Sequence, residues 1–175
     1  MSTQKQKTLT DPTVFNVGTI NSWKVRTIAN GAIVAATPID NFTVVELSFN
    51  SDGERIATQL SDVKNKQYLI AAVERRYLDE QLEEFYNEVG ERARIVIFDE
   101  GVRFETSAYT LNTGNTEVTK GDVAHFDPAS KSYIVSASGS AHAGYATAST
   151  KFTVVGDEDD TAGNFNKSTI RLEVQ

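Results

Sequence analysis

Two histidines, His125 and His142, are the side chains of this sequence best suited to acid–base chemistry near neutral pH. A catalytic histidine also needs an orienting carboxylate and a nucleophile within reach, and Asp127 and Ser136 could fill those roles. The pattern favours a simpler interpretation, in which His125 is a surface or edge residue of a strand and His142 is solvated in a loop of small residues. Neither histidine stands in the H-x-x-x-H or H-E-x-x-H spacing of zinc sites. We therefore predict no catalytic residue and no zinc.

An acidic run of four residues begins at Asp157 and suggests calcium, because hard cations bind several oxygen atoms. The calcium-loop pattern D-x-[DN]-x-[DN]-G is not met, since Thr161 and Gly163 fall out of register. We expect a solvated turn that blunts a sheet edge. Weak calcium binding at Asp157, Asp159 and Asp160 remains the alternative, which a calorimetric titration would test.

Motifs for other kinds of site are not found in this sequence. The chain has no cysteine, which excludes disulfides, thiolate metal sites and cysteine nucleophiles. Gly114 and Gly121 do not belong to the G-x-x-x-x-G-K-[ST] loop that cradles phosphate. Glu80, Glu83 and Glu84 fit an ordinary helix surface better than the carboxylate pair of a glycosidase. A formal net charge of −7 is unsuited to a phosphate backbone. We expect no cofactor, no enzyme activity and no direct binding to nucleic acid.

Length and composition indicate one domain, or one domain with an arm. The chain has 175 residues, of which 39% are hydrophobic, and nine phenylalanines supply bulky core side chains. The opening residues MSTQKQKTLT hold no apolar segment of the kind found in a secretory signal, and no window reaches the ~20 apolar residues of a membrane span. We expect a soluble protein that is made in the cytoplasm and does not bind a membrane.

The stretch from Arg92 to Ser136 organises the rest of the chain, because it predicts two consecutive strand–turn–strand units. Gly101 can supply the positive φ that a tight turn needs, and Pro128 fixes φ at a value that suits the second position of a type I turn. The four strands of these units are expected at Ala93–Phe98, Val102–Thr106, Asp122–Phe126 and Ser132–Ser136.

Outside that stretch we expect five further strands, at Ala32–Ala36, Phe42–Phe49, Tyr68–Val73, Lys151–Val155 and Ser168–Val174. Alternation along the second of these places four residues on the core face, namely Thr43, Val45, Leu47 and Phe49. One helix is expected at Asp79–Val89, where apolar residues recur at i, i+3, i+4 and i+7.

Short strands separated by turn residues at about ten-residue intervals favour an antiparallel barrel or sandwich. We predict a mainly β fold, with a small antiparallel β-barrel or sandwich, one inserted α-helix and an extended N-terminal arm. The arm comprises residues 1–28, and the β-rich globular domain comprises residues 29–175. Apolar residues between Thr13 and Ile28 hold no clean period, which suits an extended segment lying on another surface or a first strand with a bulge at Gly18.

Two groups of segments resemble proteins of bacteriophage particles. The phrase Lys120–Asp127, followed by Lys131–Val135, looks like the "G-D-V-x-x-x-D … y-v" unit of capsid decoration (cement) proteins. Residues 41–60 and 74–114 are also similar to virion structural proteins of tailed phages of Gram-positive hosts. Together the resemblance covers residues 42–136.

This resemblance implies a non-catalytic protein of the virion that binds the outside of the head and stabilises it. The implied partner is the lattice of the major capsid protein, and the protein itself would be a homo-oligomer, a trimer by analogy with decoration at three-fold positions. Its arm would add to a neighbouring sheet edge, with aromatic or apolar anchors. The anchors expected here are Phe15, Val17, Ile20 and Trp23, although Trp23 equally suits the core.

Two other classes stay open. A tail-tube or head-fibre subunit would share the virion and the β-rich composition, and a tail-tube subunit would form rings or tubes on its own. A carbohydrate-binding β-sandwich module would present aromatic residues such as Tyr109 and Tyr145 on one face.

Overall fold

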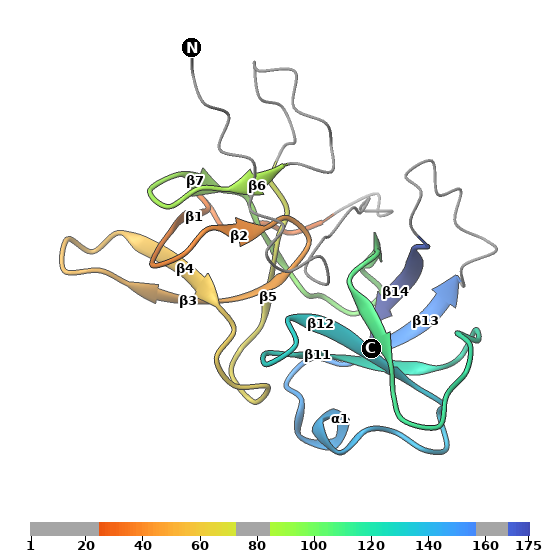
Figure 1. Ribbon diagram of the computed structural model, residues 1–175. Coiled ribbons are helices and arrows are strands. Elements are labelled where there is room, and N and C mark those ends of the chain that lie inside the picture. The colour runs from red at the N-terminus through yellow and green to blue at the C-terminus, as the bar shows by residue number, and fades with distance from the viewer. Residues whose placement is uncertain (1–24, 73–84, 157–167) are drawn as a thin grey trace, which may run out of the picture.

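The structure is a computed structural model that describes residues 25–72, 85–156 and 168–175 (Figure 1). Within these residues the fold is mainly β, and the only helix is the five-residue α1 (Ala143–Thr147). The strands form two six-stranded sheets and one two-stranded sheet. The predicted mainly β, barrel-like fold is therefore confirmed. No helix in the described part of the chain is both long and apolar enough to cross a membrane.

The first six-stranded sheet is rolled into a barrel, called here the first barrel. Its order is β7–β1–β4–β3–β5–β8. The bounds are β1 (Ala32–Val34), β3 (Val44–Phe49), β4 (Arg55–Gln59), β5 (Tyr68–Ile70), β7 (Arg92–Ala93) and β8 (Ile95–Ile97). Only Arg94 separates β7 from β8, so one bent segment pairs with β1 at one end and with β5 at the other. This bend brings the two ends of the sheet together and nearly closes it.

The second six-stranded sheet, the second barrel, closes in the same way beside the first (Figure 1). Its order is β10–β12–β11–β13–β14–β9. The bounds are β9 (Arg103–Thr106), β10 (Tyr109–Leu111), β11 (Val123–Asp127), β12 (Ser132–Ser136), β13 (Phe152–Gly156) and β14 (Ile170–Val174). Only Ser107 and Ala108 separate β9 from β10, and this segment pairs with β14 and then with β12. Closure pairs strand edges that would otherwise be exposed.

The turns of the predicted units are confirmed by backbone geometry. Gly101 has φ +82°. Outside these units, Asn30 and Gly31 have φ +61° and +57°, as a type I′ turn requires. The hairpin of β11 and β12 follows the predicted strands within one residue at each end. Lys131 takes φ +53° after the Pro128 turn, which completes the reversal.

Burial of strands on both faces explains the continuous apolar runs of the first barrel. In three neighbouring strands, successive residues enter different cores. Val45, Ile70 and Ile95 lie in the core of the first barrel. Val44, Leu69 and Val96 lie instead in a core shared with the second barrel. The shared core also contains the large aromatic side chains Phe42, Phe104, Phe126, Tyr133 and Phe152.

The predicted core face of the strand at 42–49 is wrong at its far end. Thr43 and Val45 are buried, but the Phe49 side chain is 65% exposed and lies under the guanidinium of Arg55. The hairpin of β3 and β4 projects beyond the sheet there, so alternation continues while the core does not (Figure 1).

The predicted helix at Asp79–Val89 is wrong where the structure describes it, and residues 79–84 of that helix lie outside the described residues. The described end contains β6 (Tyr86–Asn87), which pairs with β2 (Ile39–Asp40) in the two-stranded sheet. The Asn87 side chain donates a hydrogen bond to the carbonyl of Ile39 at 3.1 Å. Val89, expected on the apolar stripe, is 52% exposed. A long-range strand partner outweighs the local helical pattern here.

The chain enters the first barrel along β8. Thr27 forms an antiparallel bridge with Val96, the Ile28 N–H donates to the Ile95 carbonyl, and the Ile97 N–H donates to the Arg26 carbonyl. Both of the backbone hydrogen bonds are 2.9 Å long. The expected anchors Phe15, Val17, Ile20 and Trp23 lie outside the described residues, as do the acidic residues Asp157, Asp159 and Asp160.

Candidate functional site

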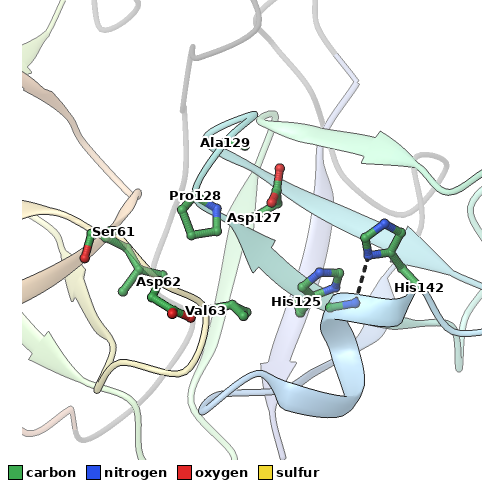
Figure 2. A pocket seen from close by; sticks show the side chains of 10 residues that line it. Ser61, Asp62, Val63, His125, Asp127, Pro128, Ala129 and His142 are labelled. Atoms are coloured by element: carbon green, nitrogen blue, oxygen red, sulfur yellow. Dashed lines mark hydrogen bonds between the residues drawn. The ribbon is translucent and has the colours of Figure 1, made fainter.

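A hollow of about 470 Å³ lies between the two barrels and is open to the surface; we call it the junction hollow (Figure 2). One wall is the loop that follows β4, and the other comprises the end of β11, the turn after it and α1. The lining residues are Leu60, Ser61, Asp62 and Val63 from the first wall and His125, Asp127, Pro128, Ala129, His142 and Gly144 from the second. Both histidines singled out in the sequence are therefore part of one site.

The prediction that His125 lies at the surface or at an edge is wrong, because its side chain is 1% exposed. Ala124 and Phe126 point into the shared core, so His125 points out of the barrel, where α1 covers it. Its ring stacks on that of His142, with centroids 5.2 Å apart and planes inclined by 17°. Its Nδ1 atom is buried and has no hydrogen-bond partner within the described residues.

The pKa of His125 is lowered to about 4, mainly by burial and also by the charge of nearby His142, while Asp127 opposes both effects. The His125 imidazole is therefore neutral at physiological pH. It can accept one hydrogen bond and donate one.

His142 is half-buried rather than solvated, because it begins α1. Its Nδ1 accepts a hydrogen bond from the Gly144 N–H at 3.1 Å, which caps the helix. Its own backbone N–H donates to the Ser136 hydroxyl at 3.1 Å. Ser136 thus holds the start of α1 and is not among the residues that line the hollow.

Asp127 keeps an ionised carboxylate at the rim of the hollow. Burial would raise its pKa, but hydrogen bonds donated by the side chain and backbone of Ser130 and by the backbone of Ala129 outweigh burial and lower it. The Ser130 hydroxyl and N–H lie 2.7 and 2.8 Å from Oδ2. Among the described residues, no hydrogen bond joins His125 to Asp127 or to Ser136, so the catalytic trio considered above is not assembled.

Sequence reasoning missed the first-barrel wall, and Asp62 above all. Asp62 lies 63 positions before His125 and 80 before His142 in the chain, and no motif marks it. A backbone hydrogen bond of 3.0 Å from Ser149 to the Val63 carbonyl holds this loop against the second barrel. Only the packing of the two barrels brings Asp62 to the site.

The chemistry available in the hollow is that of hydrogen-bond acceptors. Two carboxylates and a neutral imidazole line it beside apolar side chains, and none of the described lysine or arginine residues lines it. The described residues contain no group of three or more histidine or acidic side chains that could hold a metal ion. Tyr145 is not free to stack on a sugar, because its hydroxyl donates to Gln175 and the Lys151 ammonium lies over its ring.

Stability should fall as pH drops through the titration range of His125. The folded-state pKa of about 4 lies below the ordinary value of 6.5, so the unfolded chain binds the proton first. The neutral His125 contributes fully to the free energy of unfolding above about pH 6.5. Between pH 6.5 and pH 4 up to about 3 kcal/mol of that free energy is lost.

Urea unfolding at several pH values would measure this loss. In His125→Gln this slope should flatten, and an unchanged slope would contradict the assignment. Titration of Asp127 changes stability in a different pH range, because its pKa is lowered and the effect appears only below about pH 4.

Gly144→Ala should disturb the stacked histidines. An added Cβ would lie 2.5 Å from Nε2 of His125 and 3.3 Å from Nδ1 of His142. Alanine favours helix by up to about 1 kcal/mol, but displacing a buried ring should cost more, so we expect a net loss of about 1–2 kcal/mol. Thermal unfolding and the NMR signals of both imidazoles would measure it. Gly139→Ala is the control, because its Cβ meets nothing within 4 Å. Unmoved imidazole signals in Gly144→Ala would refute the packing described here.

Comparison with known proteins connects the chain to prophages. The family model described as "YonC prophage protein" matches residues 12–175. The chain is 49% identical over 175 residues to the SPbeta prophage-derived uncharacterized protein YonC of Bacillus subtilis strain 168, across 99% of this chain and 98% of that protein. No solved structure matches the chain.

Proposed function

The chain belongs to the YonC prophage protein family, and on that premise we propose that it is a capsid decoration protein, which binds the outside of the phage head and stabilises it. In this proposal the protein is made in the host cytoplasm and joins the virion as a non-catalytic homo-oligomer. Its partner is the lattice of the major capsid protein. The phage origin of the family and the resemblance of residues 42–136 to virion proteins support this role.

The observation that carries the proposal is how the chain enters the first barrel. From Arg26 to Ile28 the backbone is already paired with β8 by strand addition. Arg26 also forms a bidentate ion pair with Asp99, which fixes this entry point from outside the strands. Strand addition is a common way for an extended segment to bind a neighbouring sheet edge. The segment before Val25 would use the same chemistry on a capsid subunit, with Phe15, Val17, Ile20 and Trp23 as anchors.

The two barrels suit a protein displayed in many copies. Both six-stranded sheets nearly close on themselves, which lowers the tendency of copies to pair through exposed edges. The net charge of −7 favours solubility at high local concentration. Weak contacts repeated over a lattice would then add through avidity.

Co-sedimentation with empty heads of the phage that encodes the protein would test the proposal. We would compare the full chain, a chain lacking residues 1–24, and a full chain with Phe15, Val17, Ile20 and Trp23 changed to serine. The deletion stops at residue 24 because residues 26–28 pair with β8. A thermal melt of each variant would confirm that the barrels remain folded.

We expect the full chain to sediment with heads and both altered chains to stay in solution. Equal binding by all three would keep decoration and move the contact from the arm to the barrels. Failure of every form to bind would reject decoration. Spontaneous rings or tubes would then indicate a tail-tube subunit, and binding in a glycan screen would indicate a carbohydrate-binding module.

A further inference from the structure

We propose that the junction hollow binds a small organic cation, an ammonium or guanidinium group carried on an apolar stem. This site is separate from the N-terminal segment on which the decoration proposal depends. Its acceptors come from both barrels, so a bound cation would bridge the two walls (Figure 2).

The charge of the lining is the first argument. Asp127 and Asp62 are contributed by opposite walls, and among the described residues no lysine or arginine lines the hollow to neutralise them. Lys66, in the same loop as Asp62, places its ammonium over the ring of Tyr68 instead. Hydrogen bonds keep the Asp127 carboxylate ionised without using a cationic partner. A ligand that enters here is therefore favoured when it is positively charged.

His125 supplies the second and independent argument. Its side chain is 99% buried in the wall of the hollow, yet its Nδ1 has no hydrogen-bond partner in the described part of the chain. A buried polar atom without a partner is costly and calls for an explanation. A neutral imidazole lining the site can accept a hydrogen bond from a donor-rich cation without repelling its charge.

Size and apolar lining favour an organic cation over a metal ion. The hollow, at about 470 Å³, falls within the range of small-molecule sites and greatly exceeds one ion. Leu60, Val63 and Pro128 line it and offer apolar surface to an alkyl stem. A calcium ion needs six or more oxygen ligands at close range, and two carboxylates on separate walls do not supply them.

The test is an NMR titration of the full-length protein that follows the His125 and His142 imidazoles and the backbone amides. The probes are n-butylammonium and guanidinium, with n-butanol as the neutral isostere and calcium chloride at matched ionic strength. A lysine tripeptide with blocked ends is added separately to distinguish a free amine from a protein side chain. The variants are Asp127→Asn and Asp62→Asn, with Asp52→Asn, on the distant β3–β4 turn, as the control.

We expect saturable shifts confined to the two walls with the organic cations, unchanged in Asp52→Asn and about tenfold weaker in Asp127→Asn. Binding of the tripeptide alone would identify the source as a protein side chain, and binding of the free amines alone would identify a small molecule. Equal shifts with n-butanol, a response to calcium only, or no loss in Asp127→Asn would overturn the proposal. Because residues 1–24 are not involved, these results are independent of the sedimentation experiment.

Discussion

Replacing Gly31 with alanine should destabilise the protein by about 2–4 kcal/mol. Gly31 has φ +57°, and a Cβ built on it would lie 2.0 Å from the backbone oxygen of Ala93. Ala93 pairs with Ala32 in the strand ladder that closes the first barrel, so neither backbone can withdraw without breaking that pairing. The free energy of unfolding, measured in urea, would report the loss.

Gly53→Ala separates the two causes of this effect. Gly53 has φ +76°, but a Cβ there meets nothing within 4 Å. The Gly53→Ala substitution should therefore lower the free energy of unfolding only through backbone strain, by about 1 kcal/mol. If both variants lose the same stability, the close approach of Gly31 to Ala93 is not what constrains the first barrel.

Truncating Phe152 to alanine should lower the free energy of unfolding by about 3–5 kcal/mol. Its side chain is fully buried in the shared core, with ring centroids 5.2–5.8 Å from those of Phe98, Phe104 and Tyr133. Phe152→Ala removes these contacts and leaves a cavity. Because the first barrel contributes Val44 to the same core, it should lose stability together with the second.

Hydrogen exchange read separately on β3 and β13 would measure that coupling. We expect Phe152→Ala to speed exchange in both strands and to leave one cooperative urea transition. Faster exchange in β13 alone would show that the barrels are independent. Phe49→Ala is the matched control. Phe49 is also a phenylalanine but is 65% exposed, so its truncation should lower the free energy of unfolding by less than about 1 kcal/mol.

The sequence by itself determined the local features of this protein. The turn at Asn30-Gly31, the positive φ of Gly101 and the hairpin of β11 and β12 follow from residue types acting within a few positions. Hydrophobic alternation and turn spacing indicated a mainly β fold, either a barrel or a sandwich. Resemblance in short segments indicated a phage protein, which the family match supports.

The tertiary structure alone decided which strands pair, which residues are buried and where a site forms. Tyr86 and Asn87 have a helical pattern around them, yet β2 supplies a long-range strand partner. Alternation along β3 places Phe49 on the predicted core face, but Phe49 is exposed because the hairpin extends beyond the core there. His125 has no local signal for burial, because its cover is α1, which packs on β11 from later in the chain. Local preferences act over a few residues, whereas burial and electrostatics depend on what the folded chain places nearby.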